Sequence, residues 1–174
     1  MNYDTVARGE KRRIVNLMAK IVDLQGLETF LQRERRGRIV LTGGCFDILH
    51  IGHVSFLSEA KKMGGTLIVL LENDEKVKKL KGKNRPIFTQ EIRAEMLSAL
   101  ICVDLVVVLP MMENDIDYMD LVMKIKPNII AVTENDPRIK KKKRQAETAG
   151  GELRMIPSVK TLSTSALAKI IGVD

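Results

Sequence analysis

The sequence predicts an α/β protein in which a doubly wound parallel sheet of five strands lies between two layers of helices, after an N-terminal helical extension. Two observations predict this three-layer α/β/α fold. Short apolar runs alternate with helical patterns along the chain, and several of the runs are nearly continuous Val, Ile and Leu. Strands that are covered on both faces have this apolar character, and helices between strands are typical of parallel connections.

The expected strands and helices alternate along the chain. The strands cover residues 38–42, 66–72, 103–109, 128–133 and 152–156, and the helices between them cover residues 54–63, 90–100, 116–125 and 138–149. A last helix begins near Ser163 and carries Leu167, Ile170 and Ile171. Ligands of such sheets bind beyond the carboxyl ends of the strands, where the strand order reverses. This rule indicates the loops after Thr42, Glu72, Thr133 and Ile156.

The extension is expected over residues 1–36, and the α/β domain over residues 37–174. Apolar residues at helical spacing predict a first helix, and they are Ile14, Leu17, Met18 and Ile21. Asp23 is expected to cap a second helix, which Gly37 stops. The apolar residues of that second helix are Leu24, Leu27, Phe30 and Leu31.

The composition fits one globular domain. The chain has 174 residues, of which 45% are apolar, and this content argues against disorder. Only 3% are aromatic, so few rings are available to stack single-stranded bases. The net charge of +7 is compatible with nucleic acid, a membrane surface or small polyphosphates as partners.

The two cysteines and the apolar runs exclude several classes of protein. Cys45 and Cys102 form neither a disulfide framework nor a zinc pattern. No apolar run approaches the length of a membrane span, and residues 1–13 are charged and lack the apolar stretch of a signal peptide. A cytoplasmic protein without a membrane partner is therefore expected.

The segment most informative about chemistry follows the first core strand. Gly43 and Gly44 come directly after it, and His50 and His53 open the next helix. Glycines let a backbone approach a phosphate closely, and a helix N-terminus presents unpaired N–H groups to an anion. Two imidazoles three residues apart can both donate to that anion. Donors that tighten on a phosphorus centre as its bonds are exchanged are what nucleotidyl transfer needs.

A surface pair at a helix end is the simpler interpretation of His50 and His53. The chain has only these two histidines, however, and both fall in a Gly-rich turn between a strand and a helix, which favours a functional role. Zinc would need a third ligand, and none is suggested nearby. No protein-bound metal is therefore expected.

The segment resembles the cytidylyltransferase-like superfamily, whose mark is His-x-Gly-His after a Gly-x-Phe-Asp turn. The resemblance runs over residues 20–171. Residues 81–86, which carry Lys81, Arg85 and Pro86, resemble a loop of the branch that includes bacterial heptose-phosphate adenylyltransferases. Arg93 matches the arginine after that loop, and residues 162–165 resemble the family's serine- and threonine-rich turn. The segments 20–24 and 37–40 are also similar to that branch.

The resemblance implies a Rossmann-like nucleotidyltransferase domain and a reaction. An oxygen of a phosphorylated acceptor attacks the α-phosphorus of a nucleoside triphosphate, with Mg²⁺ bridging the triphosphate oxygens, and pyrophosphate leaves. The branch favours ATP with a sugar 1-phosphate. A glycerol-phosphate cytidylyltransferase and an FMN adenylyltransferase fit the same loop. A nucleic-acid-binding domain and a nucleotide sensor without turnover are the alternatives from other classes.

The resemblance also assigns roles to residues. The catalytic residues would be His50, His53 and Lys81. The nucleotide- and phosphate-binding residues would be Gly44, Cys45, Phe46, Asp47, Gly52, Arg85, Arg93, Ser163, Thr164 and Ser165. Simpler interpretations exist for several: a turn cap for Asp47, a solvated loop for Lys81 and Arg85, a surface ion pair for Arg93 and a helix N-cap for the serines.

The chain departs from the family after the fourth expected strand. Relatives commonly have a Gly-Gly-Asp turn there, whereas this chain has residues 133–137 in its place. Thr133, Glu134 and Asp136 are the expected nucleoside contacts. The basic residues 138–144 that follow are interpreted as a solvated helix face, although they could gather an anionic substrate or touch nucleic acid, which is the less favoured partner.

Met111, Met112 and the helix 116–125 lie where relatives often build subunit contacts or part of the acceptor pocket. Their periodicity alone places them in the core. By the resemblance, a homodimer or a higher homo-oligomer is expected.

Overall fold

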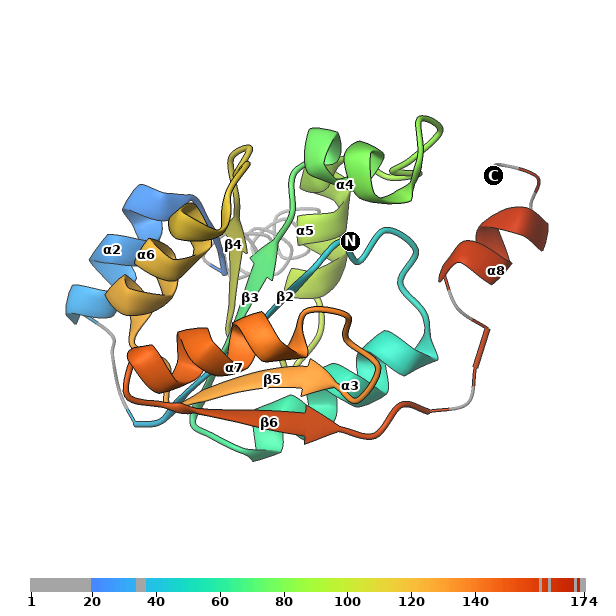
Figure 1. Ribbon diagram of the computed structural model, residues 1–174. Coiled ribbons are helices and arrows are strands. Elements are labelled where there is room, and N and C mark those ends of the chain that lie inside the picture. The colour runs from blue at the N-terminus through green and yellow to red at the C-terminus, as the bar shows by residue number, and fades with distance from the viewer. Residues whose placement is uncertain (1–19, 34–36, 160, 163, 171, 173–174) are drawn as a thin grey trace, which may run out of the picture.

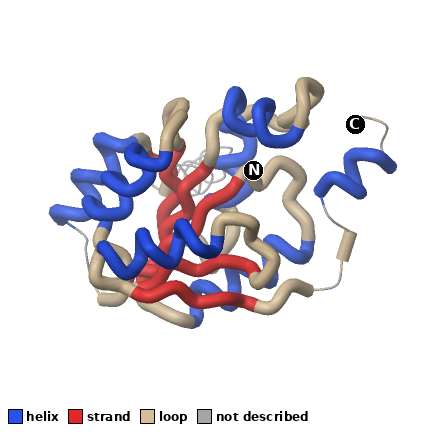
Figure 2. The backbone as a smooth tube through the Cα atoms, in the orientation of Figure 1, coloured by secondary structure: helices blue, strands red, loops and turns tan. Residues whose placement is uncertain are grey.

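Six parallel strands form one sheet in the order β1-β4-β3-β2-β5-β6 in the computed structural model, which describes residues 20–33, 37–159, 161–162, 164–170 and 172 (Figures 1 and 2). The strands are β1 (Ile21–Val22), β2 (Ile39–Gly44), β3 (Thr66–Leu71), β4 (Leu105–Val108), β5 (Ile129–Thr133) and β6 (Glu152–Ile156). All five expected strands are present within one or two residues of their expected ends.

Helices cover both faces of the sheet. They are α2 (Leu24–Arg33), α3 (Ile51–Lys62), α4 (Asp74–Lys81), α5 (Gln90–Ser98), α6 (Asp115–Ile125), α7 (Ile139–Thr148) and α8 (Thr164–Ile170). Leu41 and Ile68 share one core with α2, α6 and α7. Val40 and Leu67 share the opposite core with α3 and α5. Alternate strand residues thus point to opposite faces, and the three-layer α/β/α prediction is confirmed.

The sheet has six strands instead of the expected five because part of the N-terminal segment joins it. Ile21, expected in a helix, lies in β1 opposite Val106, and the Val106 N–H donates to the Lys20 carbonyl over 2.7 Å. Two residues are too few to show the apolar pattern of a strand in the sequence, and β1 forms because the edge of β4 is available for pairing. Ile14, Leu17 and Met18 lie outside the described residues.

The second predicted helix of that segment is confirmed as α2. The Asp23 carboxylate accepts from the Gly26 N–H at 2.8 Å and caps it. Leu27 is fully buried in the core that contains β2, β3 and β4. Within the described residues, the predicted extension and the α/β domain therefore share one core.

Helix α4 was missing from the sequence-based expectation, and Lys81, expected in a loop, is its last residue. The apolar pattern could not show this helix because Val77 is its one buried residue. The residues that mark the two ends of α4 are polar or charged. Asn73 caps the N–H of Lys76 at 2.8 Å, acidic residues occupy the first turn and lysines the last, as the helix dipole favours.

The strand order reverses between β2 and β5, since β3 lies on one side of β2 and β5 on the other. The carboxyl ends of these strands meet at one edge of the sheet (Figure 1). The loops after them are therefore neighbours, as predicted. Among the described residues, no helix combines the length and apolar character needed to cross a bilayer, and the expected cytoplasmic location stays a prediction.

Candidate active site

The two histidines form a stacked pair at the first turn of α3. Their ring centroids are 3.9 Å apart, and His50 is the N-cap residue. The Nδ1 of His50 accepts from the Gly52 N–H at 3.1 Å, and the Nδ1 of His53 accepts from the His50 N–H at 3.4 Å. The pair thus caps the helix in the way that a capping box does, a structural role that the sequence analysis did not foresee.

This arrangement fixes where the imidazoles carry their protons. Because both Nδ1 atoms accept hydrogen bonds, a neutral ring has its proton on Nε2, which is then a donor. Burial lowers the pKa of His53 to about 4, with smaller contributions from His50 and Lys81, and burial also lowers the pKa of His50. At neutral pH both rings are therefore neutral donors through Nε2.

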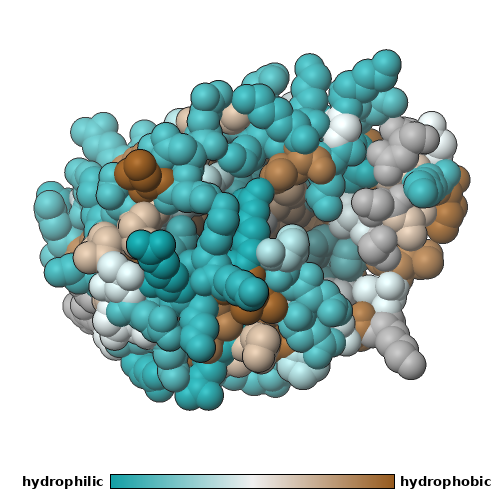
Figure 3. Space-filling model, viewed as in Figure 1, coloured by the Kyte–Doolittle hydropathy of each residue, from teal (hydrophilic) through white to brown (hydrophobic). Residues whose placement is uncertain are grey.

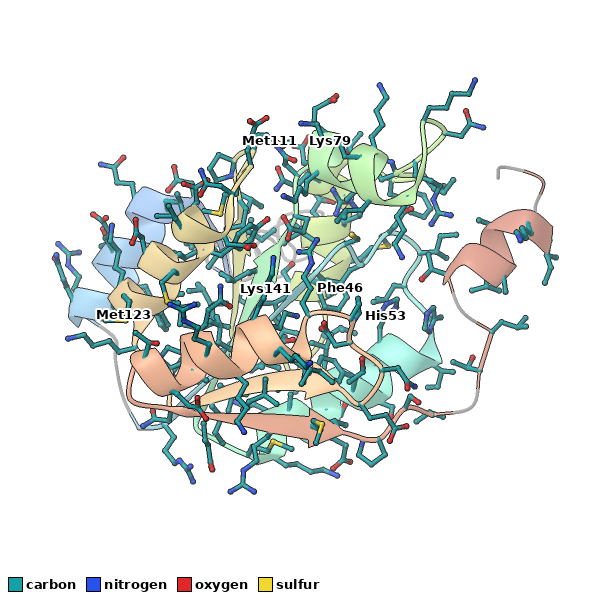
Figure 4. The ribbon with its side chains drawn as sticks, in the orientation of Figure 1. Phe46, His53, Lys79, Met111, Met123 and Lys141 are labelled. Carbon is teal, nitrogen blue, oxygen red and sulfur yellow. The ribbon has the colours of Figure 1, made fainter. Side chains whose placement is uncertain are left out.

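The glycines of the loop let other groups come close. A Cβ on Gly52 would lie 2.9 Å from His50 Cε1 and 2.9 Å from Thr161 Cγ2, and a Cβ on Gly44 would lie 3.2 Å from the ring of Phe46. Phe46 itself has a left-handed φ of 45°, a conformation that a bulky residue adopts only when its surroundings hold it there. Its ring packs 5.2 Å from that of His53 (Figure 4).

Two pockets adjoin this loop. The first, here called the histidine pocket, has a volume of about 540 Å³ and is lined by residues that include His50, His53, Thr133, Ser158 and Thr164. The second, the tyrosine pocket, has a volume of about 420 Å³ and is lined by residues that include Glu72, Tyr118, Asp115, Arg138 and Lys141.

The two pockets share a wall. It consists of Thr42, Gly43, Gly44, Cys45, Lys81, Asp136 and Lys142. Figure 3 shows that the face carrying α7 is mainly hydrophilic and is hollowed beside that helix, and Figure 4 shows Lys141 on α7 and His53 on α3. Two molecules bound side by side would meet at the glycine loop.

Asp47 and Arg85 lie behind this wall. Both side chains are 1% exposed, and Arg85 Nε lies 2.5 Å from Asp47 Oδ2. The other oxygen of Asp47 accepts from the Ile87 N–H at 2.6 Å. Arg85 lines neither pocket, so the geometry supports a bracing role for it and not that of a mobile cation, while Asp47 connects the glycine loop to the segment after α4.

Arg93 is fully buried, which contradicts its alternative interpretation as a surface residue. Its guanidinium donates to three backbone carbonyls, those of Phe88, Cys45 and Glu72, at 3.0, 2.5 and 2.9 Å. It also contacts the Asp74 carboxylate at 2.7 Å. Arg93 therefore connects the glycine loop to the end of β3 and the start of α4, and it lines neither pocket.

Lys81 has a different environment. It is exposed at the end of α4 and lines both pockets. Burial raises the pKa of the Cys45 thiol, and the charge of Lys81 opposes that rise. A thiol held in its protonated form is a poor nucleophile. The site is thus supplied with donors and a cation, without an activated nucleophile.

The three residues predicted to contact the nucleoside differ in whether they line a pocket. Thr133 lines the histidine pocket, and Asp136 lines both pockets while its carboxylate binds Lys142 at 2.7 Å. Glu134 lines neither and accepts from the N–H and hydroxyl of Ser158 at 3.2 and 3.0 Å. It connects this turn to the segment after β6.

The serine-rich turn is only partly described. Thr164 begins α8 and lines the histidine pocket, as does Thr161. Ser163 lies outside the described residues, as does Ile171, and the side chain of Ser165 is not described. The roles expected for the two serines stay predictions.

The basic run 138–144 is not a uniformly solvated face. Arg138, Lys141 and Lys142 line the tyrosine pocket, whereas Lys140, Lys143 and Arg144 are exposed. Lys141 pairs with Asp115 at 2.5 Å, and Lys142 is half-buried against Asp136. Part of the run thus lines a pocket, where two of its three cations are paired with carboxylates.

Two pocket residues were missed by the sequence analysis. Glu72 was expected as the last residue of a strand, and its position directly before a loop of the predicted site was the available signal. Tyr118 falls in the expected helix 116–125, where the pattern placed it in the core. In the structure its hydroxyl contacts the Glu72 carboxylate over 46 residues of sequence.

A search of the described residues finds no group of three or more His, Cys, Asp or Glu side chains arranged to hold a metal ion.

The sequence comparison then decides the family. A family model described as cytidylyltransferase-like matches residues 41–167. The chain belongs to the cytidylyltransferase-like family. The match contains the histidine pair, the shared wall and all the other residues that line the two pockets. The predictions of that superfamily and of a nucleotidyltransferase are confirmed.

Its curated relatives include several called bifunctional protein HldE. The protein from Helicobacter hepaticus is 45% identical over 112 residues (64% of this chain), that from Campylobacter fetus 46% over 130 residues (74%), and that from Campylobacter concisus 36% over 156 residues (90%). The matched regions are 22%, 25% and 32% of those proteins. The chain thus spans about a quarter to a third of their length.

Solved structures share the fold. The lipopolysaccharide core biosynthesis protein of Thermoplasma volcanium is 27% identical, with a TM-score of 0.56, over 72% of this chain and 99% of that chain. The pantoate-β-alanine ligase of Francisella tularensis superposes with a TM-score of 0.62 over 81% of this chain and 68% of that chain. At 14% identity, the second likeness shows the fold alone.

Proposed function

We propose that this family member transfers the AMP group of ATP to the phosphate of a sugar 1-phosphate and releases pyrophosphate. The observation that carries this proposal is the shared wall with Lys81 between two pockets, one of which is lined by the two imidazole donors. A transfer between two bound molecules requires this arrangement, since the donor and the acceptor must meet in line.

In the proposed reaction the triphosphate occupies the histidine pocket. An acceptor phosphate oxygen forms a bond to the α-phosphorus while the bond from that phosphorus to the bridging oxygen of the β-phosphate breaks, and the electron pair leaves with pyrophosphate. The Nε2–H groups of His50 and His53 and the ammonium of Lys81 stabilise the charge on the non-bridging oxygens. The backbone N–H groups of Cys45 and Phe46 are proposed to bind the triphosphate.

Mg²⁺ is proposed to enter with the triphosphate as part of the substrate. The described residues offer no cluster of carboxylates or imidazoles for it, which supports coordination mainly by phosphate oxygens and water. Thr133 and Asp136 are the residues proposed to face the nucleoside.

The choice of ATP and of a sugar phosphate rests on the relatives. The HldE proteins at 35–46% identity support a heptose-phosphate adenylyltransferase over the glycerol-phosphate and FMN alternatives. Four cationic side chains (Lys81, Arg138, Lys141 and Lys142) and three carboxylates (Glu72, Asp115 and Asp136) line the tyrosine pocket, and this excess of one positive charge supports an acceptor that carries a phosphate.

The test is a pyrophosphate-release screen that crosses ATP and CTP with heptose 1-phosphate, mannose 1-phosphate, glycerol 3-phosphate and FMN. Release with ATP and a sugar 1-phosphate is expected. Release only with CTP or only with FMN would overturn the choice of substrates. A nucleic-acid-binding protein would instead show salt-dependent oligonucleotide binding that survives substitution of both histidines.

The expected homodimer or higher oligomer stays a proposal. Light scattering on the purified chain measures it directly, and a monomeric mass at the concentration used in the screen would exclude it.

A further inference from the structure

One buried carboxylate in the tyrosine pocket has no part in the mechanism above. Glu72 directly follows β3 and is 7% exposed, and it lines the pocket away from the two histidines. The hydroxyl of Tyr118 donates to it, lying 3.0 Å from Oε1 and 2.9 Å from Oε2. A buried carboxylate is costly unless hydrogen bonds stabilise it, so its place in a pocket calls for a ligand.

We propose that Glu72, held in position by Tyr118, binds hydroxyl groups of the acceptor and thereby selects a polyhydroxylated acceptor. This inference rests on the proposed function, because it assigns the tyrosine pocket to the acceptor of that reaction. Glu72 is the specificity-determining residue, and Tyr118 is a positioning residue that acts through it.

The carboxylate of Glu72 can accept several hydrogen bonds at once. An ionised carboxylate offers about four acceptor positions, and the single proton of Tyr118 can occupy two of them at most. The remaining positions favour donors, and a sugar presents several hydroxyl donors on adjacent carbons. A carboxylate accepts from two such neighbours at once, which gives geometric specificity as well as affinity.

Tyr118 and Lys76 hold the carboxylate in position. Tyr118 is held in turn by Lys76, whose ammonium lies 5.4 Å from the centroid of the ring and donates to the Met112 carbonyl at 2.7 Å. Burial raises the pKa of the Tyr118 hydroxyl, and the charge of Glu72 adds to that rise. The hydroxyl therefore remains a donor to Glu72 at all physiological pH values.

Charge is unevenly distributed in the pocket. Lys81 and the Asp136–Lys142 ion pair belong to the wall shared with the histidine pocket, whereas Glu72 lies on the part that only the tyrosine pocket has, as do Arg138 and the Asp115–Lys141 ion pair. The buried carboxylate repels a phosphate, and the exposed Lys81 attracts it. The acceptor is thus oriented with its phosphate toward Lys81 and the histidines and its hydroxyls toward Glu72, which is the orientation that transfer requires.

Apolar side chains line the pocket together with Glu72. Leu41, Leu70, Val122 and Ile130 line the same pocket. Apolar neighbours strengthen a hydrogen bond to a buried carboxylate and make an unpaired polar group there costly. An acceptor that lacks the hydroxyls therefore loses more affinity here than it would at an exposed site.

The experiment uses heptose 1-phosphate and its singly deoxygenated analogues as acceptors in the pyrophosphate-release assay with ATP. The Glu72→Gln variant is expected to raise the KM for heptose 1-phosphate at least tenfold and to change the KM for ATP less than twofold. Tyr118→Phe is expected to act in the same direction. Glu113→Gln is the matched control, because Glu113 is an exposed carboxylate that lines neither pocket.

The decisive measurement is whether the effect of removing an acceptor hydroxyl depends on Glu72. With the unaltered protein, kcat/KM for at least one deoxy analogue is expected to be at least tenfold lower than for heptose 1-phosphate. With Glu72→Gln, kcat/KM for that analogue is expected to be less than twofold lower than with the unaltered protein. Equal losses for every analogue with both proteins would overturn the inference, as would an unchanged acceptor KM. A melting temperature for each variant identifies any that fails to fold, and Glu72→Gln keeps an oxygen that can accept from Tyr118.

Failure of the proposed function is distinguishable from failure of this inference. If the unaltered protein releases no pyrophosphate with ATP and any sugar 1-phosphate, the proposed function fails. Calorimetric titration with heptose 1-phosphate then tests the pocket itself. Binding that Glu72→Gln weakens at least tenfold would support the inference, and binding that is absent or unaffected would overturn it.

Discussion

Asp47 and Arg85 form a buried ion pair in which Asp47 Oδ2 lies 2.5 Å from the guanidinium and both side chains are 1% exposed. The pair joins the glycine loop, which carries the histidines, to the segment after α4. Its geometry makes Arg85 a support for the site, because a guanidinium held in this way cannot close over a ligand without leaving its carboxylate uncompensated.

Removing one partner of that pair should destabilise the protein strongly. Asp47→Asn removes the negative charge that lies against the buried guanidinium, and a loss of about 3–5 kcal/mol in the free energy of unfolding is expected. Urea denaturation measures it. Glu152→Gln is the control, because its pairs with Arg38 and Arg154 are exposed and should each contribute no more than about 1 kcal/mol. Equal effects of the two substitutions would show that the buried pair is not a support.

The loss of an imidazole donor should reduce turnover far more than the affinity for ATP. His53→Ala is expected to lower kcat at least about a hundredfold, the usual scale for one donor to a developing charge. Pyrophosphate release with ATP in excess measures kcat. Near-normal turnover would contradict the role of His53, and a matching loss of ATP affinity would assign the ring to ground-state binding.

The buried ring of His53 should also make stability depend on pH. Its pKa in the folded protein is about 4, mainly because of burial, whereas an unfolded histidine has a pKa of about 6.5. Between these values the unfolded chain binds more protons, so the free energy of unfolding should fall as the pH falls from about 6.5 to about 4. Urea denaturation at several pH values measures this slope. His53→Asn should make it shallower, and an unchanged slope would show that His53 does not cause it.

Lys81 should be functional without being structural. Lys81→Ala removes an exposed cation that lines both pockets, so kcat should fall at least about tenfold, part of the range known for lost charge stabilisation. The melting temperature should remain nearly unchanged. Lys78→Ala is the matched control, since Lys78 lies in the same helical turn and lines neither pocket. A large shift in the melt of Lys81→Ala would make the lysine structural.

Gly52 should be required for the position of His50. A Cβ at this residue would lie 2.9 Å from His50 Cε1, a distance at which one of the two must move. Alanine favours a helix by up to about 1 kcal/mol over glycine. Gly52→Ala should therefore lower kcat while the free energy of unfolding falls little. Unchanged kcat would show that the ring tolerates the displacement.

Local patterns predicted most of the fold because they act over short distances. Continuous apolar runs produced the five longer strands, and end signals such as Asp23 placed helices correctly. The pattern failed where an element has little apolar periodicity. Strand β1 has two residues and depends on the edge of β4, and α4 has one buried residue, Val77.

The candidate site was predictable to the extent that it lies in one segment. His50, His53 and the glycines are local in sequence, and the helix start that they form is visible there. The partners of Arg93 could not be predicted in this way. Its sequence position suggested a phosphate or a surface partner, whereas its donors bind the Phe88, Cys45 and Glu72 carbonyls, two of which belong to distant segments.

The sequence by itself determined the alternation of strands and helices, the loop with its two imidazoles and the family of the chain. Only the tertiary structure decided which polar side chains face a pocket and which brace its wall. It turned Arg85 and Arg93 inward, left Lys81 at the junction and brought Tyr118 to Glu72. The physical reason is that a backbone conformation follows from neighbouring residues, whereas the partner of a buried charge depends on which distant segment the packed sheet places beside it.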